Sequence, residues 1–142
     1  MEELTGNLVM VHPKLTDDPV QRQGQIGIIT SADLAKDEVY VGFGSSELGL
    51  YSANALLVLK SHNQLYNDIL TNIQKMDTPD FKTLMDVTLL QEKNATNYTR
   101  DAMQLAATNE RTLAYATFSL QEKLGLGREE GQEQQQSSGI NR

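Results

Sequence analysis

The chain has 142 residues, a length that fits one domain or a small β unit with a helical extension. It contains no cysteine, which excludes disulfide scaffolds and thiolate metal sites. Its net charge of −7 is spread along the chain without a basic run, which weighs against binding to nucleic acid or to an anionic membrane surface.

Short β-rich runs separated by Gly, Ser, Asn and Asp clusters fill the first 60 residues. We expect strands at about 7–11, 25–30, 38–43, 48–51 and 56–60, with a helical turn at 52–54. Gly27 lies inside the second strand and indicates a bend or a close backbone approach. The alternation of apolar residues predicts that the following side chains face the core: Ile26, Ile28, Val39, Val41, Leu57 and Leu59.

Five short strands, a long first loop and a helical turn before the last strand resemble the small barrels of the Src-homology and KOW type. The segments that carry this resemblance are Gly6–Val9, Gly24–Ile29 and Tyr51–Leu59. The resemblance covers residues 6–60 and implies a five-stranded antiparallel β-barrel. KOW barrels often contact nucleic acid or the ribosomal and transcription machinery. This chain differs from them because it is acidic. The chain also lacks the Trp of the peptide-binding Src-homology groove.

The character of the sequence changes after residue 60, where apolar residues recur at spacings of three and four. This spacing predicts helices at about 62–76, 79–93 and 96–124, the second starting with Thr78 as N-cap and Pro79. The last two segments can also run on as one helix. The predicted fold class is therefore α+β, with a small barrel at 1–60 and a helical extension of two or three helices at 61–125. Residues 126–142 are rich in Gln, Glu, Ser and Gly and are predicted to be disordered.

The apolar faces of the predicted helices indicate an association surface. The first helix carries Leu65, Tyr66, Ile69, Leu70 and Ile73 on one face. The third is longer than so small a barrel, so we expect part of its stripe, around Leu113, Leu120 and Leu124, to lack cover within the chain. The alternative is a compact bundle in which the other helices cover this stripe.

Asn109 lies on the same stripe as an isolated polar residue. It is either a hydrogen-bonded residue near the middle of a helix or a polar residue that fixes the register of a helix–helix interface.

No motif predicts a catalytic, cofactor or metal site. The two histidines, His12 and His62, have no second candidate ligand at metal-binding spacing. Asp17 and Asp18 can be paired acids or cation ligands, but beside Pro19 they are typical of a turn.

We therefore expect a non-enzymatic protein that acts by contact with a protein partner or with further copies of itself. A nucleic-acid-associated accessory role is the alternative. The candidate partner-binding residues are Tyr40, Tyr51, Leu113, Leu120 and Leu124. The acidic N-terminus and the shortness of the longest apolar run indicate a soluble cytoplasmic protein without a membrane segment.

Overall fold

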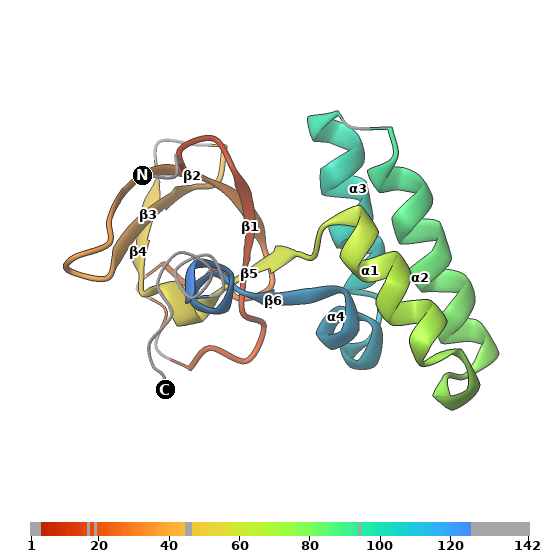
Figure 1. Cartoon of the computed structure of the whole chain (residues 1–142). Helices are drawn as coiled ribbons and strands as arrows, with labels where there is room; N and C mark the ends of the chain where they lie inside the picture. Colours follow the sequence, from red (N-terminus) through yellow and green to blue (C-terminus); the bar gives the residue numbers. More distant parts are fainter. Residues whose placement is uncertain (1–3, 17, 19, 45–46, 94, 126–142) are drawn as a thin grey trace, which may run out of the picture.

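The computed structural model describes residues 4–16, 18, 20–44, 47–93 and 95–125. A curled β-sheet lies beside a group of helices, and the chain passes between the two parts twice (Figure 1). It leaves the sheet after β5 and returns to it at β6. The segment 126–142, predicted to be disordered, lies outside the described residues.

The sheet has six antiparallel strands in the order β4-β3-β2-β1-β5-β6. Their bounds are Leu8–Val11 for β1, Ile26–Asp33 for β2, Glu38–Gly42 for β3, Leu48–Tyr51 for β4, Leu56–Leu59 for β5 and Thr117–Ser119 for β6. The short 3-10 helix η1, Ala53–Ala55, precedes β5. The β2–β3 register shifts between Ile29 and Ser31, which is a β-bulge.

The prediction of a closed five-stranded barrel is wrong. The sheet is open, because its edge strands β4 and β6 do not pair with each other. A barrel needs that last pairing, in which the two edges of the sheet hydrogen-bond and no edge remains. The resemblance of residues 6–60 to Src-homology and KOW barrels is therefore not supported. The coarser prediction, an antiparallel sheet combined with helices in an α+β fold, is confirmed.

The core of the sheet lies on its concave side, and the predicted inward set is only partly correct. Val39 and Val41 are fully buried in this core, together with Ile29. Ile26, Leu57 and Leu59 instead belong to a second cluster on the opposite face of the sheet, and Ile28 shares the parity of Ile26. These strands are apolar on both faces, because the helices cover part of the outer one, so alternation alone did not reveal which face was inward.

Four α-helices and a 3-10 helix follow. The first two α-helices begin within one residue of the predicted positions, whereas the third predicted helix is interrupted. The bounds are His62–Thr71 for α1, Ile73–Lys75 for the 3-10 helix η2, Thr78–Gln91 for α2, Thr96–Ala106 for α3 and Glu110–Ala116 for α4. Asp77, and not Thr78, is the N-cap residue of α2, and Pro79 lies in its first turn. Residues 120–125 are again helical.

The single helix predicted at 96–124 is wrong. Its middle is interrupted at Asn109, the N-cap residue of α4, whose side chain accepts a hydrogen bond of 2.9 Å from the Thr112 N–H. Its later part contains β6, which pairs with β5 at Val58↔Phe118 and Leu59↔Thr117. An open edge on β5 can bind an extended segment, so tertiary pairing overrides the helical spacing there.

Two further clusters join the helices to each other and to the sheet. One is formed between the helices by Leu65, Ile69, Leu84, Val87, Ala102, Ala106 and Ala116. The other lies between helices and sheet and contains Met10, Leu57, Met103 and Leu113. Small alanines at the helix contacts allow close approach of the backbones. Within the described part of the chain, every helix falls short of the length and apolar character that crossing a membrane requires.

Candidate functional site

The five residues predicted to bind a partner do not form one surface. Tyr51, Leu113 and Leu120 are buried, with exposed fractions of 3%, 8% and 1%. Leu124 is half-buried and packs against the core of the sheet. Tyr40 is half-buried on the outer face of β3, opposite the parity of Val39 and Val41.

The expectation that Leu113, Leu120 and Leu124 lack cover within the chain is wrong. The sheet covers this stripe, because the segment folds back as α4, β6 and the helical residues 120–125. Partner binding by these residues, and by Tyr40 and Tyr51, stays a prediction.

Tyr51 instead closes a hydrogen-bond network around Asp18. The Tyr51 hydroxyl donates to Asp18 Oδ1 at 2.9 Å, and the carboxylate also accepts the backbone N–H groups of Val20, Gln21 and Arg22. Burial acts to raise the pKa of the Asp18 carboxyl, but these hydrogen bonds outweigh it and leave the pKa below its usual value. Asp18 is thus a turn residue that joins the first loop to β4, as one of the two readings of the sequence predicted.

Arg22 extends the same network toward β4. Its guanidinium binds the Glu47 carboxylate and lies 5.5 Å from the centre of the Phe43 ring. Burial and the hydrogen bond to Asp18 raise the pKa of the Tyr51 hydroxyl, so Tyr51 stays protonated at neutral pH. These groups are satisfied by one another and stabilise the loop.

Asp80 on α2 and Arg111 on α4 form a corresponding pair in the helical part. Arg111 Nε donates to Asp80 Oδ2 at 2.8 Å, and Arg111 Nη2 lies 3.3 Å from Oδ1. The hydrogen bond from Arg111 lowers the pKa of the Asp80 carboxyl, against the effect of burial. The pair connects two helices that are far apart in the sequence.

The histidines lie apart from each other in separate surroundings. His12 Nδ1 accepts a hydrogen bond from the Lys14 N–H, and His62 Nε2 lies 3.2 Å from Glu92 Oε2. Among the described residues, no three His, Asp or Glu side chains are placed to hold a metal ion.

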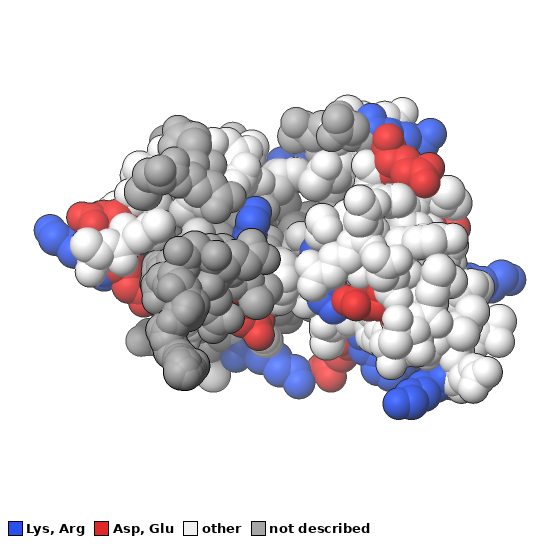
Figure 2. Space-filling model, viewed as in Figure 1, with Lys and Arg blue, Asp and Glu red and all other residues white. Residues whose placement is uncertain are grey.

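An apolar stripe on the outer side of α1 is the most distinctive surface of the helical part. It consists of Tyr66 and Leu70 on α1 and of Ile73 at the start of η2, which are 39%, 47% and 43% exposed. We call these three residues the α1 stripe. Figure 2, viewed as in Figure 1, shows that the surface over α1 is mostly uncharged, with acidic and basic atoms mainly at its borders.

The single apolar face that the sequence predicted for the first helix is divided in the structure into a buried part and an exposed part. Leu65 and Ile69 of the predicted face are fully buried, whereas Tyr66, Leu70 and Ile73 point away from the core. The apolar arc of α1 is wider than one buried stripe requires. That excess width is the signal in the sequence for a second, exposed apolar face.

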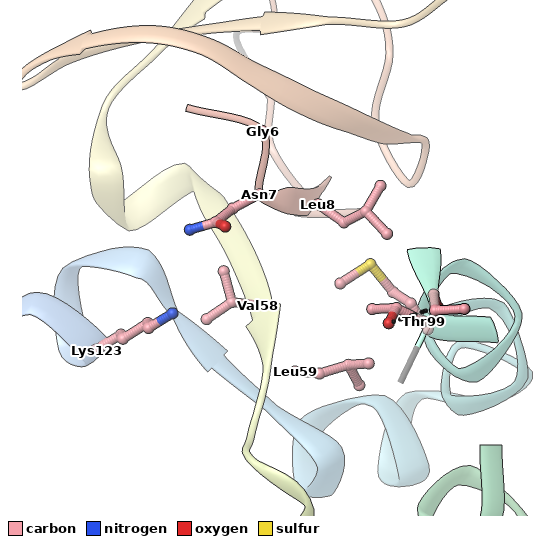
Figure 3. Close-up of a pocket in the computed structure, with 9 residues that line it drawn as sticks. Gly6, Asn7, Leu8, Val58, Leu59, Thr99 and Lys123 are labelled. Carbon is pink, nitrogen blue, oxygen red and sulfur yellow. Dashed lines mark hydrogen bonds between the residues drawn. The ribbon is translucent and has the colours of Figure 1, made fainter. Parts of the chain in front are cut away.

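A crevice opens where β1 and β5 separate, beside α3 (Figure 3). It has a volume of about 310 Å³. It is lined by Gly6, Asn7, Leu8, Val58, Leu59, Ala95, Thr99, Met103 and Lys123. We call it the β1–β5 crevice. The sequence held no signal for it, because the four segments that form it meet only in the folded chain.

Comparison with known proteins gives no function for these surfaces. No protein-family model, no curated protein and no solved structure matches the chain. Inference about function therefore depends on the geometry of the α1 stripe and the β1–β5 crevice.

Proposed function

We propose that the chain is a non-enzymatic association module that binds a second copy of itself through the α1 stripe. The observation that supports this proposal is the exposure of three large apolar side chains, two on α1 and one at the start of η2. Clustered exposed apolar groups of this kind mark interaction sites more often than scattered ones do.

The mostly uncharged surface over α1 makes the stripe the face on which a second copy can bind (Figure 2). The chain carries a net charge of −7, so two copies repel each other over most relative orientations. Asp68 is the one Asp, Glu, Lys or Arg within α1, and its carboxylate pairs with Lys60 at 3.1 Å. A two-fold axis through the α1 stripe would place uncharged surface against the same uncharged surface.

The small size of the stripe sets the expected strength of association. Three side chains bury much less area than a standard protein interface, so we expect a weak, reversible dimer. Tyr66 would provide the largest contact area, since aromatic residues are enriched in interface centres. The His62 and Tyr66 rings stack with centroids 6.1 Å apart, which holds the Tyr66 ring in place.

Sedimentation equilibrium over a concentration series from micromolar to millimolar tests the proposal. We expect the average mass of the wild-type chain to rise toward that of a dimer. The Leu70→Asp chain should stay monomeric, because the stripe would then bring two carboxylates together in an apolar contact. Leu70 is 47% exposed, so the substitution leaves the core intact, and an unchanged circular dichroism spectrum checks this.

Leu48→Asp is the matched control. Leu48 lies on β4 and is 51% exposed, so it offers the same chemical change at similar exposure on a different surface. It should associate as the wild type does. A wild-type chain that stays monomeric at millimolar concentration contradicts the proposal, as does a Leu70→Asp chain that still dimerises.

A further inference from the structure

We propose that the β1–β5 crevice binds a small monocarboxylate with a short apolar tail. This inference concerns a different surface from the α1 stripe, and it does not depend on self-association.

The charge of the crevice is the first observation. Lys123 is the only charged side chain among its nine lining residues, and it forms no hydrogen bond or ion pair with the described residues. Figure 3 shows the Lys123 amine and the Asn7 amide directed into the same region beside Val58. In a chain with a net charge of −7, this crevice has an unpaired positive charge. It therefore favours an anion over a cation.

The backbone supplies a second donor, as the hydrogen-bond alternation in β1 indicates. The Val11 N–H donates to Gln25 O on the β2 side, whereas the His12 N–H donates to Ala55 O on the β5 side. In an antiparallel strand the backbone groups of every second residue point to the same neighbour, so those of Leu8 point toward β5.

No strand partner meets the Leu8 backbone there. The β1–β5 register consists of Met10↔Leu57 and Val11↔Leu56, although β1 begins at Leu8 and β5 continues to Leu59. The two strands thus separate one step before Leu8 would pair with Leu59. By this alternation the Leu8 N–H is directed toward the crevice, where a backbone donor without a strand partner gains from an acceptor that a ligand brings.

Four apolar side chains line one part of the crevice, while Thr99 adds a hydroxyl beside them. Val58 and Met103 are 5% and 1% exposed, and the side chains of Leu8 and Leu59 complete the apolar part. A volume of about 310 Å³ is at the lower end of the range for ligand sites. One ammonium and neutral donors suit the single charge of a carboxylate, and the apolar walls suit a short alkyl chain.

A set of three ligands with the same alkyl chain tests this assignment: hexanoate, hexylamine and hexanol. Each is titrated into the ¹⁵N-labelled full chain at constant ionic strength, with amide shifts as the readout. We expect saturable shifts at Asn7, Leu8 and Thr99 with hexanoate, and much weaker effects with the amine and the alcohol. Hexylamine or hexanol binding as tightly as hexanoate overturns the proposal, and so does a hexanoate titration without saturation.

Lys123→Met keeps an unbranched apolar side chain, one atom shorter than that of Lys, and removes the charge. We expect hexanoate to bind this variant at least about tenfold more weakly, because a charge-assisted contact is lost. Lys36→Met, at an exposed position in the β2–β3 connection, is the matched control and should bind as the wild type does. Equal binding by the Lys123 variant, or displacement of hexanoate by equimolar inorganic phosphate, overturns the carboxylate assignment.

Discussion

Gly27 occupies a position on β2 where the neighbouring strand leaves no room for a side chain. A Cβ atom there would lie 2.5 Å from Val41 Cγ1 and 2.7 Å from Gly42 O. The φ angle of Gly27 is not positive, so backbone strain is not the reason for a glycine here. The requirement for glycine is therefore close packing between β2 and β3.

We predict that Gly27→Ala lowers the free energy of unfolding by more than about 1 kcal/mol, because the added methyl group forces the two strands apart. Urea denaturation followed by circular dichroism measures the change. Gly125→Ala is the control, since a Cβ atom at Gly125 meets nothing within 4 Å. Equal midpoints for wild type and Gly27→Ala would show that the sheet absorbs the methyl group.

Asn109 marks the limit of residue-scale prediction from this sequence. Its apolar neighbours at helical spacing suggested a position inside a helix, with two alternative roles. The structure supports neither, because Asn109 begins α4 and caps it. Asn followed by Glu in the first turn is a typical helix start, and this pattern was present at Asn109-Glu110. The apolar residues that continue at helical spacing on both sides of Asn109 indicated an uninterrupted helix instead.

At the scale of elements, strands were predicted better than helices, for a physical reason. The Gly, Asn and Asp clusters between the strands limit each run to a few residues, so their bounds followed from turn chemistry. The predicted helix at 96–124 lacked such breaks, and β6 within it depends on pairing with β5, which is about 60 residues away in the sequence. The β1–β5 crevice was unpredictable for the same reason, since strand separation is a long-range property.

The Asp80–Arg111 pair connects α2 and α4 and should make their packing sensitive to acid. The pKa of Asp80 is lower in the folded chain than its usual value of about 4, so the pair stabilises the fold above that pH. The stabilisation is lost as the pH falls through the lowered pKa.

We predict that Asp80→Asn lowers the melting temperature at pH 7 and has a much smaller effect at a pH below the lowered pKa of Asp80, where the wild-type carboxyl has taken up a proton. Thermal unfolding at both pH values measures this difference. Asp86→Asn, an exposed position on the same helix, is the control and should change little at either pH. A deficit of Asp80→Asn that is equal at both pH values would assign the effect to packing and not to charge.

The acidic excess of the whole molecule disfavours nucleic acid as a partner. Acidic residues outnumber basic ones by 19 to 12, and the excess is found both in residues 1–60 and in the remainder. With the barrel resemblance unsupported, no observation favours the nucleic-acid role that was the alternative function.

We predict that the chain binds duplex DNA no more tightly than about 10⁻⁶ M at physiological salt, the range of non-specific contacts. Fluorescence anisotropy with a labelled duplex, repeated at two salt concentrations, provides the measurement. Sub-micromolar binding that weakens steeply with salt would contradict this prediction and restore the nucleic-acid role.

The position of β6 affects the order in which the parts of the chain can fold. Lys60 N–H donates to Ala116 O, so the two ends of the helical segment meet where β5 ends and β6 begins. The helices thus form an insertion between two neighbouring strands of one sheet. Closing so long a loop has an entropic cost, which helices formed beforehand reduce by shortening the free chain. A ribosome must synthesise the chain through Ser119 before the sheet can receive its sixth strand.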